Sequence, residues 1–249
     1  MVTDLQKAGL WKRISAGLFD LILLVMLVVG VATLLSWAFR YDYYQQAYEE
    51  ACHRYETQYG VEFQAYEGLS AEERAAYDEA YAALIADDEA VYLYNMVMNL
   101  TLLVITFSIL LGVLLLEFAV PLLFKNGQTL GKKIFGVALM RADGVKVNTF
   151  QMLVRTLLGK FTVEIMLPVY ILIMLSFNSV GLIGIAILGG ILVGELLSFA
   201  LSRTGSLIHD TIAATVAVDM ASQRIFETPE ERVEYVKRLH AEEASRQEY

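Results

Sequence analysis

Residues 14–39 read ISAGLFDLILLVMLVVGVATLLSWAF, an apolar run whose one charged side chain is Asp20. Three further apolar stretches follow at about residues 91–124, 161–178 and 181–201. A helix needs ~20 apolar residues to cross the bilayer core, because each residue adds ~1.5 Å of length. The bilayer core offers no water to satisfy backbone groups, so helices are the spanning form that these patterns support. The sequence therefore predicts an all-α membrane protein with four transmembrane helices.

The composition agrees with this class. Hydrophobic residues make up 57% of the chain and charged residues 19%, as expected for a membrane protein with modest extramembrane parts. The first apolar run is too long for a cleavable signal peptide, and no small-residue cleavage site follows it. The single cysteine, Cys52, excludes an internal disulfide and leaves a free thiol or an intermolecular bridge. We expect the lipid bilayer as the main environment and no nucleic-acid partner.

Basic residues near the spans predict the orientation. With four spans, the basic residues that flank them all fall on one side: Lys7, Lys12, Arg13, Lys125, Lys132, Lys133, Arg141, Lys146, Arg155, Lys160 and Arg203. The segment 40–92, with thirteen acidic and three basic residues, and the turn at 178–179 fall on the other side. We therefore expect a multi-pass plasma-membrane protein with both termini in the cytoplasm.

The external segment is predicted to be a helical hairpin rich in tyrosine. Tyr44, Tyr48, Tyr55 and Tyr59 recur at helical spacing, Gly60 interrupts the pattern, and Ser70 to Glu73 form a capping box for a second helix. Two interpretations of the tyrosines stay open. They either hold the hairpin together and anchor it at the interface, or form a recognition surface for cations or a basic external partner.

The segment between the second and third spans changes its period. Val137–Arg141 and Val145–Asn148 flank an Asp-Gly turn, which is typical of a β-hairpin, and Ala214–Asp219 is also strand-like. These pieces predict a small cytoplasmic β-hairpin or sheet. The tail from Thr228 predicts a solvated helix.

We divide the chain into six segments on these grounds. They are 1–39 (cytoplasmic N-terminus and first span), 40–90 (external hairpin), 91–124 (second span), 125–160 (cytoplasmic β-hairpin segment), 161–201 (third and fourth spans) and 202–249 (cytoplasmic strand-like segment and C-terminal helix).

Four acidic residues lie inside the apolar stretches, all in the cytoplasmic half: Asp20, Glu117, Glu164 and Glu195. Charges in a bilayer are costly and mark function by default. They either form a cation or proton site that faces the cytoplasm, or neutralise basic residues at the inner boundary and hold the bundle together. Two further features bear on packing. Pro121 and Pro168 predict kinks or freed carbonyls, and Ala186, Gly190 and Gly194 form a small-residue ridge that predicts close packing against another span.

The sequence holds no nucleophile elbow, phosphate loop or metal motif that we can identify. We therefore expect no enzyme activity, no catalytic residues and no cofactor or metal site. The candidate site is a polar cluster with an ionic or structural role, made of Arg13, Asp20, Glu117, Lys132, Arg155, Glu164, Glu195, His209 and Asp210.

Several ordered motifs resemble one known family. Residues 13–20, RISAGLFD, are similar to the R-x-x-A-x-x-x-D opening of RDD-family membrane proteins, and residues 127–133, GQTLGKK, to their G-x-T-x-G-K segment. Arg155 and the pair His209-Asp210 match later signals of the family. The resemblance implies that Arg13, Asp20 and Asp210 are the arginine and aspartates for which the family is named. It implies a bacterial membrane protein for which transport is often proposed.

Two functions from different classes remain open at this point. The first is transport, or transport-associated work, with a small cation or proton as substrate. The second is a non-catalytic membrane partner or assembly factor that acts through the acidic hairpin. Association with a second copy of the chain is compatible with both.

The predicted orientation can be tested by labelling single cysteines introduced into a Cys52→Ser background. A cysteine at Tyr66 should react with an impermeant reagent from outside the cell, because it lies in the acidic loop. A cysteine at Asp143 should react from the inside only. External labelling at Asp143 would overturn the four-span topology.

Overall fold

The structure is a computed structural model that describes residues 6–63, 69–124, 126–177, 179–202 and 204–247. Four positions used in the sequence argument, Tyr66, Lys125, Asn178 and Arg203, lie outside these ranges. The chain divides into two compact units, and each is described by itself. One consists of Met1–Leu27 together with Leu110–Tyr249, and the other is Val28–Ile109.

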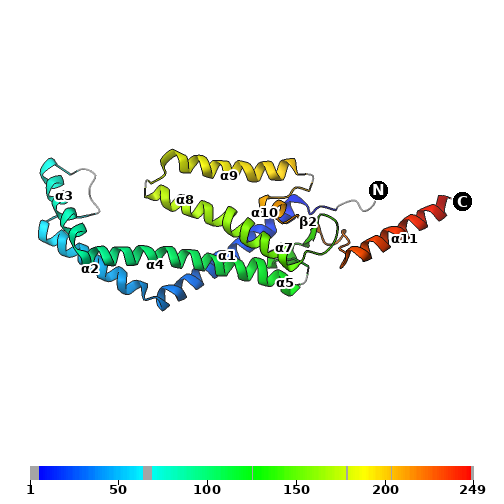
Figure 1. Cartoon of the computed structure of the whole chain (residues 1–249), viewed down its shortest axis with the longest axis horizontal. Coiled ribbons are helices and arrows are strands. Elements are labelled where there is room, and N and C mark those ends of the chain that lie inside the picture. The colour runs from blue at the N-terminus through cyan, green and yellow to red at the C-terminus, as the bar shows by residue number, and fades with distance from the viewer. Residues whose placement is uncertain (1–5, 64–68, 125, 178, 203, 248–249) are drawn as a thin grey trace. The chain divides into compact units, whose positions relative to one another are not determined.

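Four helical stretches in the described part of the chain are long and apolar enough to cross a membrane. They are Leu10–Ala38, Asp88–Phe124, Thr149–Ser176 and Gly181–Leu201. The first is α1 and the last is α9. The second consists of α4 (Asp88–Val113), η1 (Leu114–Ala119) and α5 (Val120–Phe124), and the third of α7 (Thr149–Val154), η2 (Arg155–Met166) and α8 (Leu167–Ser176). The four predicted spans are confirmed, and in Figure 1 α8 and α9 run side by side.

The unit Val28–Ile109 contains the predicted helical hairpin, α2 (Tyr41–Tyr59) and α3 (Ala71–Ala86). Gly60 ends α2 with the predicted break, at a φ of 68°, and Ser70 and Glu73 form the capping box that begins α3. The hairpin has a core of its own. Ala51 and Leu84 are buried there together with Ala90 and Leu93 from the start of α4.

Tyrosines pack against this core, as the first interpretation of them predicts. Tyr44, Tyr48 and Tyr55 lie on it. The Tyr55 hydroxyl donates to Asp87 Oδ2 at 3.0 Å, and the rings of Tyr48 and Tyr94 are 5.6 Å apart. Burial and the Cys52 partner raise the pKa of Tyr48, which keeps its hydroxyl neutral. The tyrosines therefore stabilise the hairpin, whatever else its surface binds.

The predicted small sheet is also present, with one change in its strands. β1 (Val137–Arg141) pairs antiparallel with β2 (Thr215–Asp219), and Val137 lies opposite Asp219. Residues 145–148 make only isolated bridges, from Lys146 to Met140 and from Val145 to Phe226. The tight turn at Gly144 forms, with φ at 83°, and Met140 bridges Lys146 while it also pairs with Val216 of β2, so residues 145–148 lie at the other edge of β1 without forming a continuous strand.

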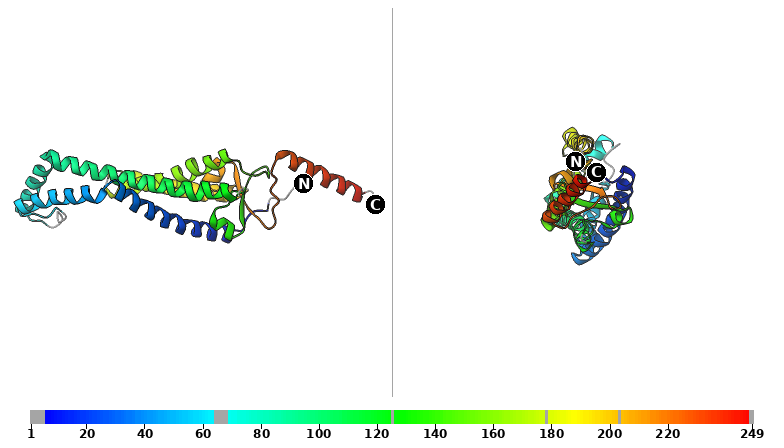
Figure 2. Two further views of the ribbon diagram at one scale, coloured as in Figure 1. Left: turned by 90° about the horizontal axis from the view of Figure 1, so that it is seen from below. Right: turned by 90° about the vertical axis from the view of Figure 1, so that its right-hand side faces the viewer.

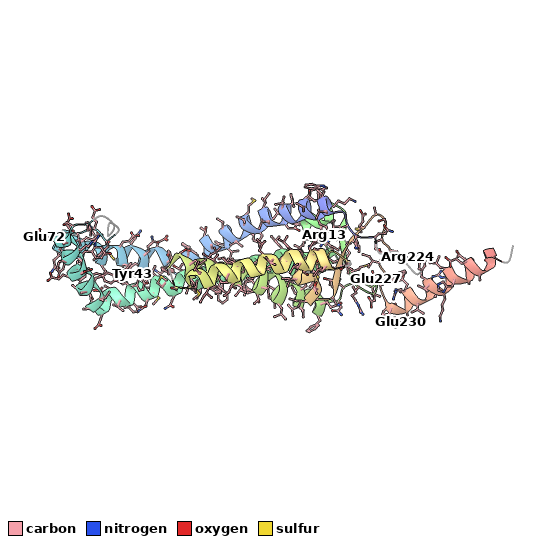
Figure 3. The ribbon with its side chains drawn as sticks, turned by 90° about the horizontal axis from the view of Figure 1, so that it is seen from above. Arg13, Tyr43, Glu72, Arg224, Glu227 and Glu230 are labelled. Carbon is pink, nitrogen blue, oxygen red and sulfur yellow. The ribbon has the colours of Figure 1, made fainter. Side chains whose placement is uncertain are left out.

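Short elements complete the first unit. α6 (Leu130–Ile134) precedes β1, and α10 (Ile208–Ile212) precedes β2. α11 (Pro229–Gln247) begins at the predicted cap, where Thr228 Oγ1 accepts from the Glu231 N–H at 3.2 Å. Figure 2 shows α11 as a single straight helix. Figure 3 labels Arg224 and Glu227, which precede this helix, and Glu230 in its first turn.

The prediction for the small-residue ridge on α9 is wrong for most of its length. A Cβ added at Gly190 would have no atom within 4 Å, and Ala186 is exposed. The close approach lies elsewhere on the helix, where a Cβ at Gly184 would meet Ile171 and Leu175 of α8 at 3.2 Å. α9 therefore contacts α8 through Gly184.

Candidate functional site

The first unit brings together all nine residues of the predicted polar cluster and adds one more, Lys160. We call these ten side chains the polar cluster. They come from α1 (Arg13, Asp20), η1 (Glu117), α6 (Lys132), η2 (Arg155, Lys160, Glu164), α9 (Glu195) and α10 (His209, Asp210). Lys160 could have been inferred from the sequence, because a buried glutamate needs a cation at similar depth.

Arg155 lies at the centre of the cluster and is 1% exposed. Its Nε donates to Asp210 Oδ1 at 2.8 Å, and its guanidinium lies 3.6 Å from Glu117 Oε2. The Thr215 hydroxyl at the start of β2 also donates to Asp210 Oδ1, at 3.1 Å. Arg155 therefore links η2 to both η1 and α10, and each buried charge has an opposite charge beside it.

Glu117 is surrounded by three cations. Lys160 Nζ lies 2.5 Å from its Oε1, and Lys132 Nζ and the Arg155 guanidinium lie 3.9 and 3.6 Å from its Oε2. The backbone of Glu117 is held as well. Pro121 has no N–H to donate to the Glu117 carbonyl, and the Thr156 hydroxyl donates to it at 3.0 Å instead. The freed carbonyl predicted for Pro121 thus joins the second span to the third.

Asp20 has different partners from those expected. The sequence favours a basic residue from 132–155 or His209 as its partner, because a buried acid is usually paired with a cation, and this prediction is wrong for its hydrogen bonds. Its Oδ2 accepts from the Thr129 hydroxyl at 2.5 Å and its Oδ1 from the Gly131 N–H at 2.8 Å. Gly131 allows this contact, because a Cβ there would lie 2.3 Å from the Ala16 carbonyl oxygen. Asp20 therefore fastens the first turn of α6 to α1.

Arg13, labelled in Figure 3, connects the start of α1 to the segment after α9. Its guanidinium donates to the Gly205 carbonyl at 2.5 Å, lies 3.9 Å from Asp210 Oδ2 and stacks over the Phe199 ring. Arg13 and Asp20 are thus each bound to a different segment rather than to each other.

His209 joins the cluster to the two remaining acids. Its Nδ1 lies 2.5 Å from Glu164 Oε1, which also accepts from the His209 backbone N–H at 3.1 Å. Its Nε2 lies 3.4 Å from Asp210 Oδ1. Glu195 Oε2 accepts from the Ile208 N–H at 3.2 Å, so α9 and η2 both bind the start of α10 through a carboxyl group.

Burial and charge shift the pKa values of the cluster residues outside the spans. Burial lowers the pKa of His209, although Asp210 opposes this. Burial also lowers the pKa of Lys132, to about 8, although Glu117 opposes this. For Asp210 burial acts in the other direction, but His209 and Arg155 outweigh it and hold the pKa well below its usual range. Asp210 is therefore ionised at neutral pH, and burial favours the uncharged form of His209.

The cluster encloses a small cavity and contains more acids than bases. The cavity has a volume of about 110 Å³, enough for water, and is lined by Arg13, Asp20, Lys132, Lys160 and Asp210 among others. With His209 uncharged, the cationic side chains of the cluster are Arg13, Lys132, Arg155 and Lys160. Against them stand five carboxyl groups, Asp20, Glu117, Glu164, Glu195 and Asp210. One further positive charge would make the cluster neutral.

Comparison with known proteins identifies the family. A model described as the RDD family matches residues 7–214. The chain belongs to the RDD family. The match takes in every member of the polar cluster, so the RDD arginine and aspartates that we assign to Arg13, Asp20 and Asp210 meet within one unit. No curated protein and no solved structure matches this RDD chain.

The site predicts a specific sensitivity at Gly159 of η2. A Cβ at Gly159 would lie 2.5 Å from the Cβ of His209 and 2.6 Å from its Cα, so Gly159→Ala must displace α10. We expect a loss of about 1–3 kcal/mol in stability, the usual result of overpacking. Thermal unfolding of the purified protein in detergent measures it.

The matched control is Gly189→Ala in α9. A Cβ at Gly189 would have no atom within 4 Å, so this variant should unfold at the wild-type temperature or above it. Equal stability of the two variants would show that α10 does not pack tightly on η2.

Proposed function

We propose that this RDD-family protein works in transport, or in support of transport, at the bacterial plasma membrane, with a proton or small cation as substrate. We propose no enzyme activity for it. The observation that carries the proposal is the charge balance of the polar cluster. The cluster holds five carboxyl groups against four cations, and two of those carboxyl groups, Asp20 and Asp210, line a cavity large enough for water. Such a site favours the uptake of one additional positive charge.

The chemistry of the cluster favours a proton over a chelated metal ion. Within the described residues, no group of three or more His, Cys, Asp and Glu side chains is arranged to hold a metal. The carboxylate of Asp20 is occupied by a hydroxyl and a backbone N–H, and those of Glu117 and Asp210 by cations. A proton needs one acceptor atom, whereas a dehydrated metal ion needs several.

The proposal also allows that this chain assists a transporter rather than transporting alone, because the titratable groups of the polar cluster all lie in one half of the membrane. The opposite halves of the spans carry hydroxyl and amide groups, such as Ser36, Asn99 and Ser176. A proton relay through the whole membrane needs titratable groups or water in that half as well. A second chain, or a second copy of this one, would supply the remaining path.

A flux measurement tests the proposal. The purified full-length chain in sealed liposomes should dissipate a pH gradient faster than protein-free liposomes, with Na⁺ or K⁺ present or absent to find any coupling. Glu195→Gln, which removes one cluster acid, should reduce the flux to the protein-free rate. Glu227→Gln, at an exposed acid outside the spans, should leave it unchanged. Wild-type flux equal to that of protein-free liposomes under every gradient would exclude transport by the chain alone.

The second candidate function is that of a membrane partner acting through the hairpin. A specific observation favours it: the hairpin lies in the unit Val28–Ile109 and has its own buried core. Its segment carries thirteen acidic and three basic residues, whose field attracts cations or a basic partner. At physiological salt that field decays over ~8 Å, so only close contacts matter.

Deletion of residues 44–88, with a short linker joining the ends, separates the two functions. If the chain transports, the deletion variant should insert and keep most of its flux, because it retains every residue of the polar cluster. If the chain is an assembly partner, the variant should insert but fail to support function in the cell. Failure to insert would show that the hairpin is needed for folding. That result would contradict both the expectation for a transporter and the expectation for an assembly partner.

A further inference from the structure

Three titratable side chains from three elements meet at one edge of the polar cluster. They are Glu164 of η2, Glu195 of α9 and His209 of α10. Glu164 Oε1 lies 2.5 Å from His209 Nδ1, and Glu164 and Glu195 accept from the consecutive backbone N–H groups of His209 and Ile208, which places their carboxyl groups beside each other. A carboxyl–carboxyl hydrogen bond requires a proton on one of the two groups, because two carboxylates have only acceptors and repel each other.

The hydrogen bonds around the pair distinguish its two members. Glu164 accepts two bonds from His209, through the ring and through the backbone N–H, and these favour its ionised form. Glu195 accepts one, from the Ile208 N–H to Oε2. Its Oε1 is buried and has no hydrogen-bond donor within the described residues. A proton on Oε1, donated to Glu164, would satisfy this atom.

The charges that face the three groups come from every element around them. Asp210 of α10 lies 3.4 Å from His209 Nε2, and Arg155 of η2 binds Asp210. Lys160, also on η2, forms an ion pair with Glu117, and its positive charge also attracts the Glu164 carboxylate. Arg13 of α1 lies beside Asp210, and Lys132 of α6 lies beside Glu117. These groups leave the cluster one positive charge short of neutrality when all five carboxyls are ionised.

We propose that Glu164, Glu195 and His209 form a proton-binding site that holds one exchangeable proton, carried by Glu195 Oε1 and shared with Glu164. On release, the O–H bond of Glu195 breaks and the proton passes to water. The cluster then holds one uncompensated negative charge until a proton or cation replaces it. The role of this exchange in transport rests on the proposed function, but the site itself can be tested without transport.

Infrared spectroscopy of the purified full-length protein in detergent tests the site. The carbonyl band of a protonated carboxylic acid should be present at neutral pH and disappear at alkaline pH. Glu195→Gln should abolish this band. The variant should also keep the wild-type unfolding temperature, because a glutamine oxygen can accept from the Ile208 N–H while its N–H₂ donates to Glu164, as the protonated acid does. Glu227→Gln should retain the band.

The outcomes separate the site from the proposed function. Absence of the band in the wild type, or its survival in Glu195→Gln, would overturn the site. A marked loss of stability in Glu195→Gln would also overturn it, because an ionised Glu195 is then required by the fold. A band that behaves as expected, together with no proton flux in liposomes, would leave the site standing and exclude transport by this chain alone. Flux that persists in Glu195→Gln, with the band abolished, would leave the site standing and show that the flux does not pass through Glu195.

Discussion

The first unit depends on the compensation of one buried cation, the Arg155 guanidinium, which is 1% exposed. A charge in the bilayer is tolerated when its partners are close and its hydrogen bonds are made. Asp210 and Glu117 provide this compensation from two other elements, and Lys160, Lys132 and Arg13 balance those acids in turn. Loss of Asp210 or Glu117 leaves a buried cation without its partner in a medium of low dielectric constant, so these ion pairs hold the unit together.

Two glycines and a proline make the arrangement geometrically possible. Gly131 lets α6 approach the Ala16 carbonyl, which brings its N–H to Asp20, and Gly159 lets α10 approach η2, which brings His209 to Glu164. Pro121 cannot donate a backbone N–H to the Glu117 carbonyl, and the Thr156 hydroxyl of the neighbouring span donates to it. Close backbone contact and polar pairing thus occur at the same points, as expected where water is absent.

The spans, the hairpin and the membership of the cluster could be predicted from the sequence, because apolar length and intramembrane charge are local properties. The pairing within the cluster could not. Asp20 was expected to bind a base and instead binds Thr129 and Gly131, since either kind of partner satisfies a carboxylate and one sequence does not show which lies nearer. The partner of β1 was equally open, because Val145–Asn148 and Thr215–Asp219 have similar strand character. The buried strand β2 pairs with β1, and this follows from tertiary contacts.

The same network that stabilises the unit also limits which of its charges can change. Asp210 and Glu117 are each bound by at least one cation at 2.8 Å or less, so protonating them would strand a buried positive charge. Glu195 faces another acid and a single backbone N–H, and no cation of the described residues lies within 4 Å of it. Its charge can therefore change at the least cost to the rest of the cluster. A structural network and a proton-exchange site are thus compatible in this unit, since ion pairs and hydrogen bonds occupy the other four carboxyl groups and leave Glu195 free to titrate.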